Sequence, residues 1–503
     1  MTGAITRREM LAASVAATQL RGATAKRPNF VFILADDHAG YAMGADGNPL
    51  ASTPHLDSLA KQGTRFAGHY CNAPVCTASR QSFFTGQLPH MAGVTRLPTP
   101  LDAAKPTLAK QFKSAGYKTA VFGKMHFNRP AEPGLHGFDV MMTEGELTRA
   151  WQKDVKPKVL PSDLRVKPQW KPFQDPARIW LNSEKLPLGR VAAEMKGTYL
   201  ANQAVKFLEE NRGETFALWT SFQEPHSPFD FPLEYANRLS PLKYPAPAVA
   251  AADQWQIPNI FRDLSPDEKA GIRAAYYTSA AFLDHNVGQV LNALKKLGLE
   301  ENTYVVYMAD HGYCLGEHGR FEKHCGYDQA LRVPLIMRWP KKIRSGVVAD
   351  FTEHIDVPAT ITDMMGLEPL PIQHGQTLRP YLEGRRPVMA RSHIFSEYLE
   401  NEEAFIRTKD YKYMFCSGKR KRTDGYETDK PTPGRYERLY NLTKDPGELE
   451  NVVTQETDAA SRLRQMLLDR FRATHPDAAQ EPQRLSAGDA LEWYVRPRDV
   501  DKA

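Results

Sequence analysis

Cys76 stands where a loop of small residues leads into a short apolar helix. The run from Cys76 to Arg80 continues to Thr85, and Gly86 can end that helix. A cysteine at a helix start lies beside unpaired backbone N–H groups and the positive end of the helix dipole, so an anion can settle there. Taken alone, a single cysteine is more often a buried thiol. A chemical role for Cys76 therefore depends on which residues the fold brings to it.

Acids, bases and cations follow four hydrophobic runs elsewhere in the chain. The runs are Asn29–Leu34, Tyr117–Phe122, Thr215–Phe222 and Thr303–Ala309. The residues that follow them, in the same order, are Asp36-Asp37-His38, Gly123-Lys124-Met125-His126, Glu224-Pro225-His226 and Asp310-His311-Gly312. Continuous apolar runs indicate strands buried on both faces, and open parallel sheets bind ligands just beyond the carboxyl ends of their strands. We therefore expect these groups to meet at one edge of a sheet.

Three carboxylates, those of Asp36, Asp37 and Asp310, would repel one another at such an edge unless a cation lay between them. Ca²⁺ suits this set because it accepts several carboxylate oxygens in loose geometry, whereas Mg²⁺, the alternative, usually keeps more water. A single aspartate after a strand is more often a turn residue or a helix cap. The adjacent pair, together with a third acid beside His311, favours a metal site.

Positive charge is supplied by Arg80, Lys124 and Lys323. Together with a divalent metal, these side chains would suit a tetrahedral oxyanion such as a sulfate or phosphate group. His126 and His226 are then candidates for proton transfer, although a single histidine is more often structural.

Helices are predicted between these runs from their capping and stop signals. One covers Pro54–Gln62, with Thr53 as its N-cap and Gly63 as its stop. Another is the long stretch Asp267–Leu297. Strands that alternate with helices predict an α/β fold in which helices sandwich a large, mostly parallel sheet.

The pattern changes after Pro380, where short antiparallel strands and a helix are predicted. The strands are His393–Glu397, Ala404–Arg407, Tyr411–Phe415 and Arg438–Leu442, the charged run 419–430 forms a hairpin tip, and the helix is Asp458–Arg472. We therefore expect a catalytic domain at 27–375 and a smaller C-terminal α+β subdomain at 376–503, which carries an antiparallel sheet.

Two proline-rich segments are candidates for the walls around the site. Residues 128–195 interrupt the sheet pattern and carry basic and aromatic side chains: Lys153, Lys156, Lys158, Trp170, Lys171 and Trp180. Long insertions in compact domains are often functional, and this one would suit a basic, aromatic rim for a sulfated sugar. A solvated loop over the core is the alternative. The segment Phe229–Pro258 is a candidate second wall.

Composition and the N-terminus indicate an exported protein. A formal net charge of +6 is mild for 503 residues. No nucleic-acid motif and no apolar run of spanning length is present, so neither a nucleic-acid partner nor stable membrane insertion is expected. Arg7-Arg8 precedes an alanine-rich stretch, and Ala23-Thr24-Ala25 has a small-x-small cleavage pattern. These features predict a twin-arginine export signal at 1–25 and a periplasmic or extracellular bacterial protein.

Five cysteines do not indicate a disulfide scaffold. Cys314 and Cys325 flank the Asp310–Lys323 loop, and for this pair a disulfide formed after export and two free thiols both remain open. Cys71 and Cys416 are expected to be free.

In combination, these motifs resemble those of the type I sulfatases, which belong to the alkaline-phosphatase-like superfamily. The matching runs are Phe-Ile-Leu-Ala-Asp-Asp-His, Thr-Pro-His-Leu-Asp-Ser-Leu-Ala, Cys-Thr-Ala-Ser-Arg, Gly-Lys-Met-His, Glu-Pro-His-Ser-Pro-Phe, Ala-Asp-His-Gly, Arg-Val-Pro-Leu-Ile and Leu-Tyr-Asn-Leu followed by Asp-Pro-Gly-Glu. The resemblance extends from about residue 28 to about residue 455, and it is the order of the motifs that makes it specific.

The resemblance implies a covalent mechanism that needs a maturation enzyme. In this family the motif cysteine, here Cys76, is converted to formylglycine, whose hydrated aldehyde is the nucleophile. The resemblance places this side chain with Asp36, Asp37, Asp310 and His311 around calcium. One hydroxyl of the hydrate, activated by the metal and Asp310, would attack the sulfur.

The resemblance also assigns roles to the cations and bases. Arg80 would orient the hydrate, and Lys124 would bind it or the sulfate. His226 and Lys323 are the expected proton donors to the leaving alcohol. His126 would take the second hydroxyl's proton as the sulfated hydrate collapses to the aldehyde. Lys124, His226 and Lys323 would also bind the substrate.

The chain departs from the family pattern at three positions. Ala78 stands where the family usually has proline, and Gln87 where an arginine is common, both within the stretch that maturation enzymes recognise. His311 replaces the asparagine of some members and can still ligate a metal. For His324, beside Lys323, two interpretations stay open: it binds substrate at the site, or it caps a turn.

The sequence thus predicts a sulfuric ester hydrolase that acts on a sulfated carbohydrate. Three alternatives are a phosphonate or phosphate ester hydrolase, a sulfatase for a small non-sugar ester such as choline sulfate, and a sulfoglycan-binding protein in which Cys76 stays a thiol. The complete set of acids and bases argues against the binding protein.

Overall fold

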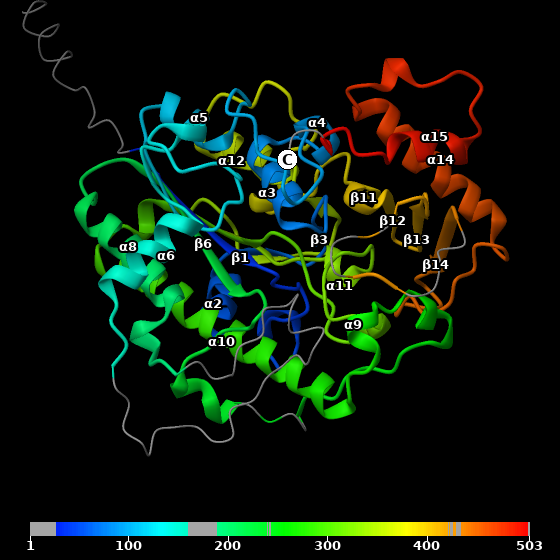
Figure 1. Ribbon diagram of the computed structural model, residues 1–503. Coiled ribbons are helices and arrows are strands. Elements are labelled where there is room, and N and C mark those ends of the chain that lie inside the picture. Colours follow the sequence, from blue (N-terminus) through cyan, green and yellow to red (C-terminus); the bar gives the residue numbers. More distant parts are fainter. Residues whose placement is uncertain are drawn as a thin grey trace, which may run out of the picture.

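A mixed eight-stranded sheet lies at the centre of the larger part of the molecule (Figure 1). The computed structural model describes residues 27–158, 189–238, 240, 243–420, 422, 426–428 and 434–500. The strand order is β5-β4-β6-β1-β7-β8-β2-β9. The strands are β1 (Asn29–Asp36), β2 (Thr64–Phe66), β4 (Lys118–Gly123), β5 (Val140–Met142), β6 (Phe216–Pro225), β7 (Thr303–Ala309), β8 (Leu335–Arg338) and β9 (Gly346–Val348).

The four predicted strands are adjacent and parallel at the middle of this sheet. β1 pairs with β6 on one side and β7 on the other, and β4 pairs with β6. Every residue of β1 is buried, as its continuous apolar run requires of a strand covered on both faces. The predicted mostly parallel α/β sheet is therefore confirmed, with antiparallel pairing where β8 meets β7 and β2.

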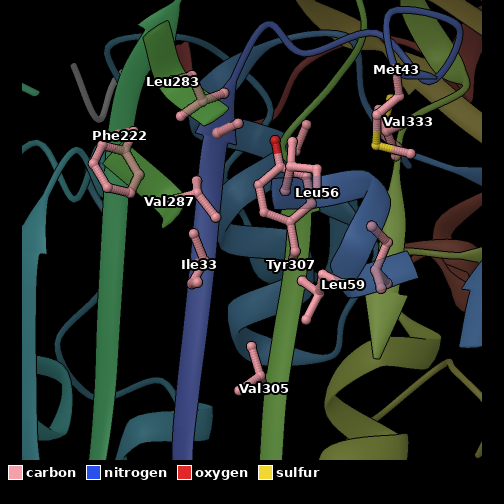
Figure 2. Packing of buried hydrophobic residues seen from close by; sticks show 14 of the residues in the cluster. Ile33, Met43, Leu56, Leu59, Phe222, Leu283, Val287, Val305, Tyr307 and Val333 are labelled. Atoms are coloured by element: carbon pink, nitrogen blue, oxygen red, sulfur yellow. The ribbon is translucent and has the colours of Figure 1, made fainter. Parts of the chain in front are cut away.

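Alternate residues of β1 face two different helix layers. Ile33 packs toward α2 and α10 with Leu56, Leu283 and Val287 (Figure 2). Phe32, one residue earlier, packs on the opposite face with α3, α5 and α12. The helices of the two layers are α2 (Pro54–Gln62), α8 (Lys196–Glu210) and α10 (Pro266–Lys296) on the first face, and α3 (Cys76–Thr85), α5 (Leu108–Ser114) and α12 (Asp356–Met365) on the second.

Helix ends follow the predicted signals with one exception. Gly86 ends α3 in the left-handed conformation, with φ of 73°, and the Gly63 N–H closes α2 on the Leu59 carbonyl. Thr53 is the N-cap residue of α2, as predicted, and its carbonyl accepts from the Asp57 N–H. Its side chain does not cap the helix, because the hydroxyl donates to the Asp57 carboxylate and accepts from the Gly44 N–H.

The insertion at 128–195 contributes to the sheet rather than only interrupting it. Its residues form the edge strand β5, which pairs with β4, and the helix α6 (Glu144–Asp154). The short run Val-Met-Met gave too little pattern to predict a strand. Of the expected rim, Lys153, Lys156 and Lys158 are exposed, whereas Trp170, Lys171 and Trp180 lie outside the described residues.

A second, antiparallel sheet follows in the order β11-β12-β13-β14, as predicted. Its strands are β11 (His393–Tyr398), β12 (Glu403–Thr408), β13 (Tyr411–Cys416) and β14 (Tyr436–Asn441), and α14 (Thr457–Thr474) and α15 (Ala487–Tyr494) pack against it. The short pair β3 (His69–Tyr70) and β10 (Thr352–Glu353) forms a third sheet.

The chain stays on the larger core as far as the short helix α13 (Arg379–Leu382). Tyr381 and Leu382 pack in the same hydrophobic cluster as Phe32. The passage to the second sheet therefore falls between Leu382 and His393, and the limit at residue 375 remains a prediction. Part of the expected hairpin tip at 419–430 and all of the expected export signal lie outside the described residues.

Candidate active site

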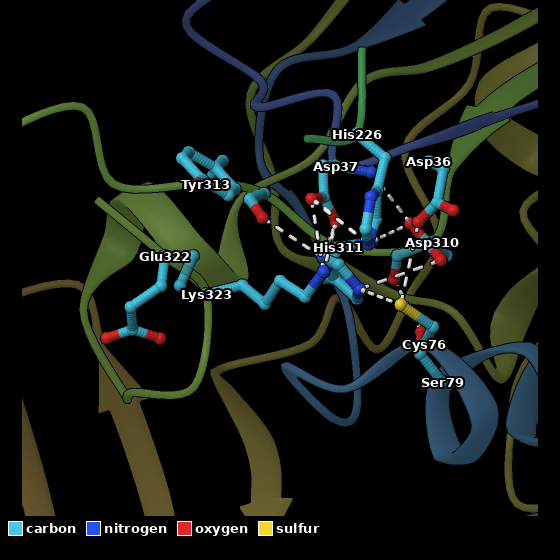
Figure 3. A network of polar contacts seen from close by, with 12 residues as sticks. Asp36, Asp37, Cys76, Ser79, His226, Asp310, His311, Tyr313, Glu322 and Lys323 are labelled. Carbon is cyan, nitrogen blue, oxygen red and sulfur yellow. Dashed lines mark hydrogen bonds and ion pairs between the residues drawn. The ribbon is translucent and has the colours of Figure 1, made fainter. Parts of the chain in front are cut away.

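The ends of the central strands bring the predicted polar groups to one buried place (Figure 3). Asp36 ends β1 and Asp310 follows β7, while His226 follows β6. Cys76, the first residue of α3, faces them. Hydrogen bonds and close contacts between charged groups connect nine of the predicted site residues: Asp36, Asp37, Cys76, Arg80, Lys124, His226, Asp310, His311 and Lys323.

The thiol of Cys76 touches an acid, an imidazole and an ammonium group. Its Sγ lies 3.5 Å from Oδ1 of Asp36 and 3.1 Å from Nε2 of His311. Nζ of Lys124 lies 3.9 Å from the same sulfur. Burial, followed by the charge of Asp36, raises the pKa of the thiol. The neutral thiol is thus favoured, and this environment does not activate a thiolate nucleophile.

Arg80 connects the helix of Cys76 to three strands of the sheet, β4, β6 and β7. One turn after Cys76, its Nε donates to Oδ2 of Asp310 at 2.8 Å, and its Nη1 donates to Oγ of Ser221 at 2.8 Å and to the Lys124 carbonyl. The side chain is fully buried. A guanidinium presents several donors in one rigid plane, which suits this multiple anchorage.

Asp37 occupies a conformation that few residues other than glycine adopt, with φ of 64°. Its N–H donates to Oδ1 of Asp310 at 3.1 Å, and Nζ of Lys323 donates to both of its carboxylate oxygens, at 2.9 and 3.1 Å. Nδ1 of His311 lies 3.3 Å from Oδ1 of Asp37. Such a strained backbone persists only where surrounding contacts fix it, and it is common at functional sites.

Three buried carboxylates face two buried cations, Arg80 and Lys323, and the partly exposed Lys124 in this cluster. Burial and the neighbouring acids raise the pKa of Asp37 to about 6. Asp36 is equally buried, but Lys124, His226 and Arg80 outweigh this burial and lower its pKa. Burial opposes the charge of Lys323, yet Asp37 raises the pKa of that ammonium group well above its ordinary value. Asp36 and Lys323 therefore stay charged.

The donor set fits a divalent cation. Ligand atoms of Asp36, Cys76, Asp310 and His311 all lie within 4.8 Å of one another, as do those of Asp36, Asp37, Cys76 and His226. Oδ2 of Asp36 is buried and accepts no hydrogen bond from the described residues, although the Lys124 ammonium lies against it. Crowded carboxylates that raise one another's pKa are the environment that a hard cation relieves.

His226 connects this cluster to a cavity of about 590 Å³. Its Nδ1 lies 2.6 Å from the Ser227 carbonyl and donates to it, so Nε2 points toward Asp37, 3.9 Å away. Burial, with Lys323 and Lys124, lowers the pKa of the imidazole. The other walls include Trp151, Arg190, Lys196, Glu224 and Asp230.

His126 and Lys124 line an adjacent cavity of about 270 Å³. His126 has a φ of 53°, and its N–H donates to Oε1 of Glu144 at 2.8 Å. Burial and the charge of Lys124 lower its pKa, so the imidazole is neutral and can accept a proton.

His324 differs from the other predicted residues in its surroundings. Its ring stacks on Tyr398, with ring centroids 5.4 Å apart, and meets Tyr426 edge-on at 5.0 Å. Its backbone N–H donates to the Glu322 carboxylate. A role for His324 in substrate binding remains a prediction.

Three polar residues that hold this geometry were not predicted from the sequence. Ser221 binds Arg80 and the Lys124 carbonyl, Ser79 donates to the Asp310 carbonyl at 2.5 Å, and His354 lies 3.1 Å from the Ser79 hydroxyl. Ser221 had a detectable signal, as a polar residue at the carboxyl end of an apolar run. His354 had none, because nothing around it in sequence indicates its neighbours.

Two family models together match most of the chain. Residues 28–367 match the sulfatase model, and residues 316–475 match the C-terminal model of N-sulphoglucosamine sulphohydrolase. Choline-sulfatase of Rhizobium meliloti is 26% identical, over 94% of this chain and 91% of its own length. N-acetylglucosamine-6-O-sulfatase of Bacteroides thetaiotaomicron is 27% identical, over 85% of this chain and 83% of its own length.

Solved structures share the fold. The phosphonate monoester hydrolase of Agrobacterium radiobacter superposes with a TM-score of 0.74 at 26% identity, covering 92% of this chain and 99% of that one. The alkaline-phosphatase-like architecture expected from the motifs is therefore confirmed. The chain belongs to the sulfatase family and is an enzyme of that family, a sulfuric ester hydrolase.

Proposed function

We propose that this sulfatase removes sulfate from a sulfated carbohydrate, with formylglycine at position 76 as the nucleophile and calcium in the carboxylate cluster. The observation that carries the proposal is the convergence of Cys76 with three carboxylates and three cations in one buried place. The family assignment supports the same interpretation, because the matched region contains all of these residues.

Asp36, Asp37, Asp310 and His311 would hold the cation, together with the side chain at position 76. When bound, Ca²⁺ supplies charge that neutralises the carboxylates and polarises the sulfate oxygens. When formed, the aldehyde at position 76 supplies a hydrate as the nucleophile. The hydrate suits repeated turnover better than a thiol does, because its second hydroxyl provides a way to release the sulfate.

The cations around Cys76 orient the reacting groups. Lys124 lies against both the sulfur of Cys76 and Asp36, where its ammonium can bind a sulfate oxygen. Arg80 binds Asp310 and so holds α3 in place, with position 76 facing the carboxylates. Neutral His126 is suited to take a proton as the side chain at position 76 is regenerated.

His226 and Lys323 are suited to protonate the leaving alcohol. His226 lies at the border between the carboxylate cluster and the larger cavity, where the alcohol would emerge. Its lowered pKa reflects burial and two nearby ammonium groups, and the negative charge of a sulfate ester acts in the opposite direction. Lys323 stays protonated beside Asp37 and is the second donor.

Replacing His226 with asparagine is expected to slow hydrolysis of a sugar sulfate by about 10²–10⁴-fold. The loss for nitrophenyl sulfate should be much smaller, because nitrophenolate leaves without protonation. Steady-state kinetics on both substrates measures the difference. His285→Asn is the matched control, on the exposed face of α10. Equal losses on the two substrates would show that His226 is not the proton donor.

The carbohydrate assignment is supported by relatives and by the larger cavity. Relatives act on sulfated sugars, such as the N-acetylglucosamine-6-O-sulfatase. The cavity beside His226 has the size and mixture of charged and aromatic walls that small-molecule sites require. Turnover of a panel of defined sulfated mono- and oligosaccharides, with choline sulfate included, tests it. We expect at least one sugar sulfate to exceed choline sulfate in kcat/KM, and turnover of choline sulfate alone would refute the assignment.

A phosphonate or phosphate ester hydrolase is the second candidate, favoured by the likeness to the Agrobacterium enzyme. Matched nitrophenyl sulfate, nitrophenyl phosphate and phenylphosphonate esters distinguish the two. We expect the highest kcat/KM on the sulfate, and a preference for either phosphorus ester would favour the second candidate.

Maturation and export are part of the proposal. Every residue of α3 is buried, so an enzyme that converts Cys76 needs the unfolded chain. Ala78 and Gln87, the departures from the family motif, are buried too. Conversion before folding is compatible with export to the periplasm or beyond, as the N-terminal arginine pair predicts. Among the described residues, no helix combines the length and apolarity needed to cross a bilayer.

A further inference from the structure

Two buried cysteines face each other on the segment that carries Lys323. The Sγ atoms of Cys314 and Cys325 lie 3.7 Å apart, and the two residues are 0% and 3% exposed. Both are free thiols in this structure. Neither takes part in the chemistry proposed for position 76.

The backbone between them forms a closed loop whose ends run side by side. The Cys314 N–H donates to the Glu322 carbonyl at 2.8 Å, and the Gly316 N–H donates to the Arg320 carbonyl at 2.8 Å. The Cys325 N–H then donates to the Lys323 carbonyl at 2.7 Å, which turns the chain back toward Cys314. The sulfur atoms are therefore brought together by the loop's own hydrogen bonds.

We propose that Cys314 and Cys325 form a disulfide in an oxidising compartment and thereby close this loop. Each thiol loses its hydrogen as the Sγ–Sγ bond forms. The two electrons and two protons pass to the disulfide of an exchange partner, such as oxidised glutathione or a dithiol oxidoreductase, which leaves as two thiols. Since a disulfide has an S–S distance of about 2.05 Å, the side chains must turn toward each other from their thiol positions.

The bond would hold the proton donor Lys323 on a covalently closed ring. Lys323 lies two residues before Cys325, and its ammonium donates to both oxygens of Asp37. The same ring is held from outside by a hydrogen bond from Nδ1 of His318 to the Asp253 carboxylate, at 2.8 Å. A disulfide restricts the unfolded chain, so closing this ring stabilises the fold around the active site.

Burial decides when the bond can form. It raises the pKa of the Cys314 thiol, so the folded protein exposes little thiolate to an oxidant. Oxidation is therefore expected during folding or when the loop opens, and once formed the bond should be slow to reduce.

Peptide mapping tests the pairing directly and independently of activity. The full-length protein is unfolded with reductant and refolded with oxidised glutathione, its remaining thiols are alkylated in denaturant, and it is digested with trypsin without reduction. Cleavage after Lys296, Arg320, Lys323 and Arg332 places Cys314 in peptide 297–320 and Cys325 in peptide 324–332. We expect these two peptides to be joined, with a mass two hydrogen atoms below their sum.

Two outcomes would overturn the proposal. One is full alkylation of both cysteines after oxidation. The other is a link between peptide 324–332 and peptide 66–80, which would make Cys71 or Cys76 the partner of Cys325. Cys71 is the relevant competitor, because it is also buried and belongs to the same hydrophobic cluster as Cys325.

Thermal unfolding of protein refolded with oxidised glutathione or with reductant supplies the second measurement. The melting temperature of the parent should be several degrees lower after refolding with reductant, and that of Cys314→Ser should be the same in both preparations. Cys416→Ser is the matched control, since this buried thiol lies on β13 and should retain the parent's response. Each variant is compared only between its oxidised and reduced preparations, so any direct destabilisation by the substitution cancels. Equal melting temperatures for the parent refolded with oxidised glutathione and the parent refolded with reductant would contradict a stabilising bond.

Discussion

Replacing Cys76 with alanine is expected to reduce sulfate ester turnover by about 10⁴-fold or more, because the variant can form no nucleophile at this position. The fold should survive, since alanine fills most of the small volume of the side chain and the backbone hydrogen bonds of α3 do not involve the thiol. Steady-state kinetics on nitrophenyl sulfate, with circular dichroism to confirm folding, measures the result.

Cys71→Ala is the matched control for this experiment. Cys71 is equally buried and lies five residues earlier, but its sulfur donates to the Ala330 carbonyl instead of meeting the carboxylates. Its variant should keep activity within a few-fold of the parent. Activity of Cys76→Ala within tenfold of the parent would show that position 76 is not the nucleophile.

Replacing Asp310 with asparagine is expected to have a comparable effect. The Asp310 carboxylate accepts from Arg80 and from the N–H groups of Asp37 and His311, so it organises three elements while also serving as a proposed metal ligand. The amide removes its charge and half of its acceptor capacity. We expect a loss of about 10³-fold or more in kcat, with weakened calcium binding measurable by titration calorimetry.

Metal removal from the parent should produce the same loss reversibly. A strong chelator should abolish turnover, and Ca²⁺ should restore it more completely than Mg²⁺. Asp284→Asn is the matched control for Asp310→Asn. Asp284 is also buried, but its carboxylate accepts from the N–H groups of His55 and Leu56 at the start of α2. It should keep metal-dependent activity. A parent enzyme indifferent to exhaustive chelation would contradict the carboxylate-cluster assignment.

The central strands were predictable because their apolar runs and their polar ends lie in the same short segments. β1 and β7 are read directly from such runs, and their carboxyl ends carry Asp36 and Asp310. The rule that parallel strands end at one edge then brings the acids together without further information. The cluster of acids could be predicted for this reason, although the roles proposed for its members came from the family resemblance.

Features that depend on tertiary contact were not predictable. β5 is three residues long and becomes a strand only because β4 offers it an edge. Thr53 has the residue type of a helix cap, yet Asp57 and Gly44 engage its hydroxyl instead. His354 reaches Ser79 across 275 positions of sequence, a separation that no local pattern reveals.

The most direct test of the account compares aldehyde content with activity. Preparations made with increasing amounts of a formylglycine-generating enzyme should contain increasing fractions of tryptic peptide 66–80 in which the Cys76 sulfur is replaced by an aldehyde oxygen, with Cys71 in the same peptide still a thiol. Mass spectrometry gives the fraction, and nitrophenyl sulfate hydrolysis gives the activity. We expect kcat to rise in proportion to the aldehyde fraction and to extrapolate to zero. Full activity in a preparation whose position 76 is entirely thiol would contradict the account.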